Sequence, residues 1–216
     1  MSTKDFEDTR WREKPQQEEF RHRAALSLIS SGRVLDVGCG DGFLMDRLRD
    51  RGIAVQGVDL SPVAVAHCTE QNLKAVICDI TNDPLPFRNG AFTTVVALDV
   101  LEHVLNPEKI VSEMARVSSE YVVIGVPNFS SLPARLQTLV GNVPENNHAH
   151  KGHVYWFNWN VLEKMAADSR LKIDEVRVNA PGGRLSVVGP ILRACARMFP
   201  NVFALSFVVR FSKKQS

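Results

Sequence analysis

The chain has 216 residues and a mass of 24.1 kDa, a length typical of one domain, and its 44% hydrophobic content excludes disorder of the whole chain. Its 26 basic and 24 acidic residues give a formal net charge of +2, which excludes a globally basic nucleic-acid binder. The charge is uneven: the chain after Glu175 carries seven basic residues and no acidic one, and the part up to Glu175 is net acidic at −5. We therefore expect no nucleic-acid partner.

The cysteines and the N-terminus indicate the compartment. Four cysteines are scattered without a C-x-x-C pair, at positions 39, 68, 78 and 195, which is typical of reduced residues in a cytoplasmic protein. The N-terminus is charged and lacks the apolar core of a secretory leader. No run of about 18 uncharged apolar residues is found, so no membrane-spanning helix is expected. We expect a cytoplasmic protein.

The first half of the chain predicts a regular α/β pattern. Residues 1–31 are expected to form a lid-like segment and a helix at 16–30, because Gly32 suits a helix end. Strands and helices then follow as strand 33–38, helix 42–52, strand 53–60, helix 62–72, strand 74–80, strand 92–100, helix 107–117 and strand 120–128. Ser61–Pro62 and Asn106–Pro107 are typical helix starts. This alternation predicts a parallel sheet covered by helices on both faces.

The second half is less regular. Residues 129–157 are predicted to be a loop, and loops of that length are often functional. The elements expected after it are helix 159–168, strand 171–180, helix 189–198 and strand 202–211. We expect one domain over residues 1–216, in which 129–157 is an insertion beside the ligand site.

A glycine-rich turn follows the first predicted strand. Residues 34–42 read VLDVGCGDG, with the spacing G-x-G-x-G rather than the G-x-G-x-x-G of dinucleotide sites. Asp36 precedes the turn, Asp59 ends the second strand and Asp79 ends the third, so three carboxylates follow one edge of the sheet. These carboxylates would repel a pyrophosphate and attract a cationic sulfonium. The pattern therefore favours S-adenosylmethionine (SAM) over a nicotinamide dinucleotide.

Several motifs resemble those of class I SAM-dependent methyltransferases. They are VLDVGCGDG (34–42), GVDLS (57–61), CDI (78–80), LPF (85–87) and FTTVVALDVLEHV (92–104). Within that class the chain is similar to the type 11/12-like group, which includes MetW-like and quinone-biosynthesis methyltransferases. The resemblance implies a three-layer, Rossmann-like sandwich with a seven-stranded sheet in the order 3-2-1-4-5-7-6, strand 7 antiparallel. It also implies SAM as cofactor, with S-adenosylhomocysteine (SAH) as product.

The resemblance also implies which residues bind SAM. Residues near the methionine part would be Asp36, Gly38, Cys39 and Gly40, and those near the ribose and adenine would be Asp59, Leu60, Cys78, Asp79 and Ile80. Leu98, Asp99 and Val100 would line the pocket floor. Arg21 lies before the first strand, where an arginine can pair with the carboxylate of SAM, although a solvated helix face is the favoured interpretation.

The acceptor side is less defined. Histidines titrate near neutral pH, so candidate proton acceptors are His103, His148, His150 and His153. Tyr155 is a third catalytic candidate beside His103 and His153, and it could instead recognise the acceptor together with Trp156. No Asp, Cys or second cluster completes a metal site around the histidines, so we expect no metal. Without the D/N-P-P-Y motif of nucleic-acid amino methylases, a small-molecule or a lipid- or quinone-like acceptor is favoured.

Other interpretations stay open at this stage. A MetW-like protein could bind SAM without turnover and modulate a partner protein. An NAD-dependent dehydrogenase is disfavoured by the glycine spacing. The basic C-terminal segment could contact an anionic membrane through Phe199, Val202 and Phe203, or it could simply complete the core. The sequence does not predict an oligomeric state.

Overall fold

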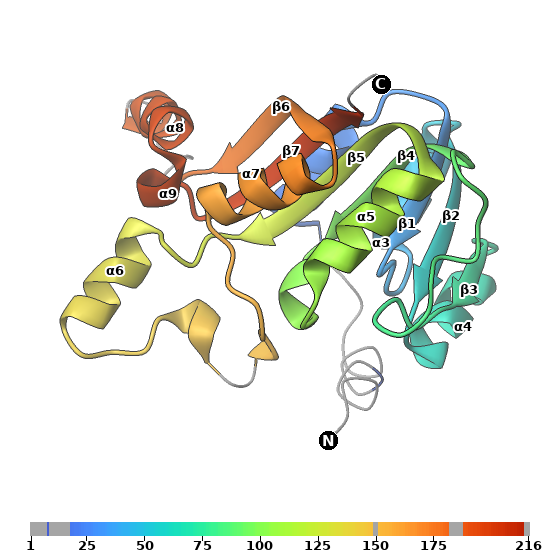
Figure 1. The fold of residues 1–216 in the computed structure, drawn as a ribbon, viewed down its shortest axis with the longest axis horizontal. Coiled ribbons are helices and arrows are strands. Elements are labelled where there is room, and N and C mark those ends of the chain that lie inside the picture. Colours follow the sequence, from blue (N-terminus) through green and yellow to red (C-terminus); the bar gives the residue numbers. More distant parts are fainter. Residues whose placement is uncertain (1–7, 9–17, 149–150, 182–187, 214–216) are drawn as a thin grey trace.

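The computed structural model describes residues 8, 18–148, 151–181 and 188–213 (Figure 1). Seven strands form one sheet in the order β3-β2-β1-β4-β5-β7-β6. The strands are β1 Arg33–Val37, β2 Ala54–Asp59, β3 Ala75–Ile77, β4 Phe92–Leu98, β5 Ser118–Pro127, β6 Leu171–Asn179 and β7 Ser206–Lys213. The pairs from β3 to β5 are parallel, and β7 runs antiparallel to β5 and β6. The predicted α/β topology is confirmed.

Helices connect the strands. They are α2 Phe20–Leu28, α3 Phe43–Asp50, α4 Pro62–Glu70, α5 Pro107–Val117, α6 Leu132–Leu139, α7 Trp159–Asp168, α8 Val188–Met198 and α9 Pro200–Phe203, with 3-10 helices η1 Leu101–His103 and η2 Glu145–Asn147. Ser61 caps α4 by accepting a 3.3 Å hydrogen bond from the Ala64 amide, as its position predicts. Within the described residues, Asn106 makes no such side-chain bond, so the start of α5 rests on Pro107.

The core lies on both faces of the sheet. Val34 and Val96 pack with α2 and α3 on one face, whereas their neighbours Leu35 and Val95 lie in the cluster that includes α5 and α7 on the other. Figure 1 shows α5 and α7 on one side of the strands and α2 on the opposite side. Because both faces are covered, the strands read as continuous apolar runs rather than as alternating ones.

Three sequence-based expectations are corrected. The predicted strand 74–80 covers only Ala75–Ile77, so Asp79 does not end it but starts a turn, in which it accepts from the Thr81 amide. The segment 129–157 is not a loop throughout, because it contains α6 and η2. The last strand begins at Ser206 rather than at residue 202, because Pro200 starts α9. The buried Asn128 side chain secures α9 by donating to the carbonyls of Pro200 and Ala204, at 3.1 and 2.7 Å.

Among the described residues, no helix combines the length and the apolar character needed to cross a bilayer.

Candidate functional site

The glycine-rich turn lies where β1, β2 and β4 end together. Gly38, Gly40 and Gly42 have positive φ angles of 72°, 55° and 86°. A Cβ atom on Gly38 would lie 2.4 Å from the Cγ2 atom of Val100, so only glycine lets the turn approach the residues after β4. The amide of Gly38 also donates to the Val58 carbonyl at 2.8 Å, which holds the turn against β2.

Asp59 ends β2 beside this turn, as the sequence predicts. Its Oδ2 atom accepts a 2.8 Å hydrogen bond from the Gly40 amide, and its Oδ1 atom accepts a 2.9 Å bond from the Ser61 amide. The Ser61 hydroxyl in turn donates to Asp8. A carboxylate can accept about four hydrogen bonds in all, and ribose hydroxyls are suitable donors to it. The buried Asp59 therefore both shapes the turn and fits its expected role.

Asp36 is buried in β1 two residues before Gly38. Burial, together with the nearby negative charge of Asp59, raises the pKa of the Asp36 carboxyl to about 7. A cationic ligand placed here would favour the ionised form. The acidic site is thus matched to a ligand that carries positive charge.

The third predicted carboxylate, Asp79, follows β3. Its Oδ1 atom accepts from the Thr81 amide at 3.0 Å and its Oδ2 atom from the Asn82 side chain at 2.8 Å. Burial works to raise the pKa of Asp79, but the hydrogen bonds from Thr81 and Asn82 outweigh it and hold this pKa below its usual value. Cys78 is buried beside it, and Leu60 and Ile80 are half-buried. Asp79 is therefore ionised and fixed at the edge of the sheet.

The predicted pocket floor follows β4. Asp99 adopts a left-handed φ of 53°, and its carboxylate pairs with the Arg21 guanidinium at 2.8 Å. Arg21 thus meets Asp99, a partner that the sequence did not indicate. Both residues line a cleft of about 370 Å³, whose walls also include Ser131, Ala134, Asn146 and Phe207. This cleft connects the end of β4 with α6.

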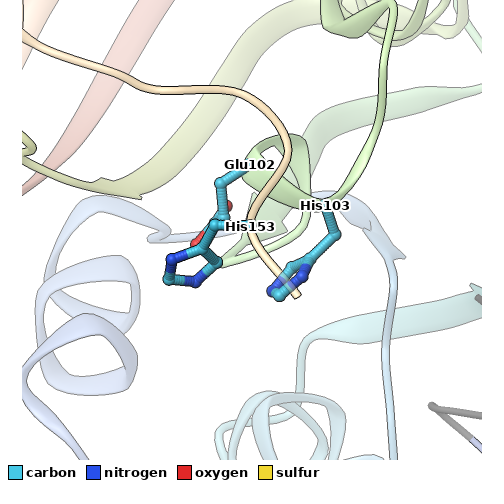
Figure 2. Close-up of side chains that lie close together, drawn as sticks. All are labelled: Glu102, His103 and His153. Atoms are coloured by element: carbon cyan, nitrogen blue, oxygen red, sulfur yellow. The ribbon is translucent and has the colours of Figure 1, made fainter. Parts of the chain in front are cut away.

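Three side chains, those of Glu102, His103 and His153, form a cluster (Figure 2). Glu102 and His103 belong to η1, whereas His153 comes from the insertion 129–157. The two imidazole rings lie 4.9 Å apart, and Glu102 is buried. The backbone also joins these segments, because the Glu102 carbonyl accepts from the amides of Val154 and Tyr155 at 2.8 and 3.1 Å.

The hydrogen bonds of the two rings indicate their tautomers. The Nδ1 atom of His103 lies 3.1 Å from the Gly152 carbonyl, and that of His153 lies 2.7 Å from the Asn146 carbonyl. A carbonyl only accepts, so each Nδ1 carries the hydrogen and Nε2 is the acceptor nitrogen of the neutral ring. One atom from each of the three side chains lies within 4.8 Å of the others, so the cluster could also hold a divalent metal ion. The expectation of no metal stays a prediction.

The side chains of Tyr155 and His148 have partners outside this cluster. Tyr155 donates to Glu108 on α5 at 2.8 Å, and burial together with this bond raises the pKa of its phenol to about 12. It therefore stays protonated at neutral pH. His148 is exposed and its ring contacts the Val143 carbonyl at 3.2 Å, and His150 lies outside the described residues.

Sequence reasoning assigned no role to Glu102. The sequence feature that could have pointed to Glu102 is the presence of an acidic residue within the apolar motif VVALDVLEHV, where burial is expected. Its proximity to His153 depends on a contact between segments about 50 residues apart, for which a single sequence carries no signal.

The reversed last strand, the G-x-G-x-G turn and the acidic strand ends together define a class I SAM-dependent methyltransferase. Solved structures share this fold. A SAM-dependent methyltransferase of Thermotoga maritima, described as a possible histamine N-methyltransferase, matches with a TM-score of 0.66 at 16% identity, over 90% of this chain and 88% of that chain. The magnesium protoporphyrin IX methyltransferase of Synechocystis PCC 6803, solved with bound SAH, matches with a TM-score of 0.69 at 16% identity, over 98% of both chains.

The family follows from sequence comparison. Residues 19–171 match the family model described as Methionine biosynthesis protein MetW, and the chain belongs to this family. A phosphatidylethanolamine N-methyltransferase of Cereibacter sphaeroides is 31% identical over 169 residues, which cover 76% of this chain and 81% of that protein. A ubiquinone biosynthesis O-methyltransferase of Dechloromonas aromatica is 41% identical over 98 residues, 43% of this chain and 42% of that protein.

The chain is therefore a SAM-dependent methyltransferase. Its named relatives are methyltransferases, so they do not favour a SAM-binding protein without turnover. The match to the quinone-related relative spans less than half of that protein's length.

Proposed function

We propose that this methyltransferase acts on an amphipathic acceptor, a lipid- or quinone-like molecule whose polar group enters the cleft between α2 and α6. The proposal rests chiefly on the composition of this cleft. One end carries Arg21 and Asp99 next to the end of β4, and the walls include apolar side chains such as Phe20, Leu205 and Phe207. Such a lining suits a ligand with one polar end and an apolar body.

The relatives support the same class of acceptor. One is named for phosphatidylethanolamine and another for ubiquinone biosynthesis, and both names refer to molecules that combine a polar group with long apolar chains. One name specifies methylation of nitrogen and the other of oxygen, so together they do not decide which acceptor atom this protein methylates. The shared property is therefore the amphipathic character of the acceptor.

SAM, when bound, supplies a methyl group on a positively charged sulfur. The fit of this site to SAM rests on its donor set: three glycines with positive φ and the carboxylates of Asp36, Asp59 and Asp79 at adjacent strand ends. We assign Asp59 to the ribose hydroxyls and Asp36 to the cationic end of the ligand. The ion pair of Asp99 and Arg21, which lines the cleft, then lies between the bound SAM and the cleft.

The paired imidazoles provide a route for a proton. If the acceptor is a hydroxyl or an ammonium group, it must lose a proton, and an Nε2 atom of His103 or His153 can accept it. Glu102 lies close enough to stabilise the resulting imidazolium, and Asn146, whose carbonyl contacts His153, also lines the cleft. We assign proton transfer to this pair rather than to Tyr155.

The experiment is a transfer assay with methyl-labelled SAM. Purified protein is offered phosphatidylethanolamine in mixed micelles, an alkyl-substituted hydroquinone, and the same two polar groups without apolar chains. We expect labelled product from an amphipathic acceptor and markedly less from its truncated counterpart. Equal turnover of both forms, or product from the truncated forms alone, would refute the proposed acceptor class.

A further inference from the structure

Large apolar side chains are exposed mainly at one end of the molecule. Eight of the thirteen such side chains among the described residues lie there. Five belong to α6 and the turn after it, namely Leu132, Leu136, Leu139, Val140 and Val143. Leu139 is 80% exposed and Val140 is 71% exposed, whereas Ala134 is the one residue of α6 that is buried.

The other three, Ile191, Met198 and Phe199, lie on α8 and at its junction with α9. We call these eight residues the apolar rim. Figure 1 shows α6, α8 and α9 projecting from the same end of the sheet. Asn128 connects them, because its side chain donates to α9 carbonyls and α6 begins four residues later. The rim is therefore one feature of the fold rather than scattered residues.

The segments that carry the rim are basic in sequence. No acidic residue occurs between Glu120 and Glu145, or after Glu175, although Glu18 and Glu19 line a groove with Arg193. Arg135 on α6 and Arg193 and Arg197 on α8 are exposed among the apolar residues. Apolar side chains interspersed with cations complement an anionic lipid surface, in which the former enter the headgroup region and the latter meet phosphates.

We propose that the apolar rim docks this methyltransferase on an anionic lipid bilayer. The sequence suggested such a contact through Phe199, Val202 and Phe203. In the structure only Phe199 is well exposed, since Phe203 packs against the core and Val202 is half-buried. We therefore assign the docking face to α6 and α8, and five of its eight apolar residues come from the insertion 129–157.

The rim also lies next to a route into the site. A groove of about 620 Å³ is lined by Arg193 of α8 and shares Glu19, Phe20, Asn179 and Leu205 with the cleft that reaches Asp99. A lipid-like acceptor could thus enter the cleft from the side of α8. This role in acceptor delivery rests on the proposed function, whereas docking itself does not.

The test is co-sedimentation of the full chain with vesicles. Vesicles of phosphatidylcholine alone are compared with vesicles that also contain phosphatidylglycerol, at low and high salt. We expect binding to the anionic vesicles that weakens as salt rises. Replacing Arg193 and Arg197 by Gln should weaken partition roughly 30-fold. The matched control replaces Lys74 and Arg88, exposed cations outside the rim, and should bind as the wild type does.

A second variant, Leu136→Asp with Leu139→Asp, should abolish binding while SAM affinity and the circular dichroism spectrum stay unchanged. No sedimentation at low salt would overturn the proposal. So would equal loss in the Lys74 and Arg88 control, or self-association through the rim without vesicle binding. Failure of the proposed function gives a different result: vesicle binding persists, but no amphipathic acceptor is methylated in the transfer assay.

Discussion

The cofactor side and the acceptor side of this site are built in different ways. On the cofactor side, Asp36, Asp59 and the glycine turn are neighbours in one sheet, and Asp59 is fixed by backbone amides. On the acceptor side, His103 and His153 come from segments 50 residues apart, and the insertion that carries His153 also presents five of the eight residues of the apolar rim. The first side is thus built from neighbouring strand ends, whereas the second depends on how a distant insertion packs.

The largest expected effect is on the acceptor side. His103→Gln or His153→Gln removes a proton acceptor, so kcat should fall about 10²- to 10⁴-fold for an acceptor that loses a proton. SAM affinity, measured by calorimetry, should stay unchanged, because neither ring belongs to the cofactor side. The control is His148→Gln, an exposed histidine outside the cluster. Weakened SAM binding in the two cluster variants would break the distinction between the two sides.

A chelator refines the same prediction. If the imidazoles act alone, dialysis against EDTA should leave kcat unchanged. Loss of activity that a divalent ion restores would contradict the expectation of no metal and would assign the cluster Glu102, His103 and His153 to metal binding.

On the cofactor side, Asp59→Ala should weaken SAM binding roughly 100-fold, because two charge-assisted hydrogen bonds to the ribose are lost. Calorimetric titration measures this directly. Asp50→Ala, which removes an exposed acid at the end of α3, is the control for net charge. Since Asp59 also holds the amides of Gly40 and Ser61, a circular dichroism spectrum must accompany the titration. Equal affinity in wild type and Asp59→Ala would refute the ribose assignment.

Arg21 lies between the two sides. Arg21→Gln removes the ion pair with Asp99, and SAM affinity should fall about tenfold if the guanidinium also meets the ligand carboxylate. Arg23→Gln, on the same helix, should have no effect. If Arg21 acts only through Asp99, the double variant Arg21→Gln with Asp99→Asn will bind SAM no more weakly than the single variant Asp99→Asn. That result would show that Arg21 does not contact SAM.

A pH dependence is also expected on the cofactor side. The raised pKa of Asp36, about 7, means that the free protein keeps this carboxyl protonated below neutral pH. SAM favours the ionised form, so its affinity should rise by up to about tenfold per pH unit and level off above pH 7. Between its unfolded pKa near 3.8 and 7 the native carboxyl binds more protons than the unfolded one, so the free energy of unfolding falls as pH rises. Asp36→Asn should remove both trends.

The difference between the two sides also explains what the sequence could predict. The order of the strands, the glycine turn and the place of Asp59 at the end of β2 depend on local patterns and on regular alternation, so the sequence predicts them well. Some strand bounds differ, since the predicted strand 74–80 covers only Ala75–Ile77. The pairing of His103 with His153 and that of Arg21 with Asp99 depend on how distant segments pack. The sequence does not predict the helix α6, because its leucines are exposed and do not form the apolar stripe by which a core-facing helix is recognised.

The account is tested most directly by a crystal structure of the protein with SAH. We expect the ribose hydroxyls on Asp59, the homocysteine end near Asp36 and Gly38, and the sulfur directed toward the cleft that Arg21 and Asp99 line. Electron density for the adenosyl group away from the glycine turn, or a sulfur atom that faces away from this cleft, would contradict the account.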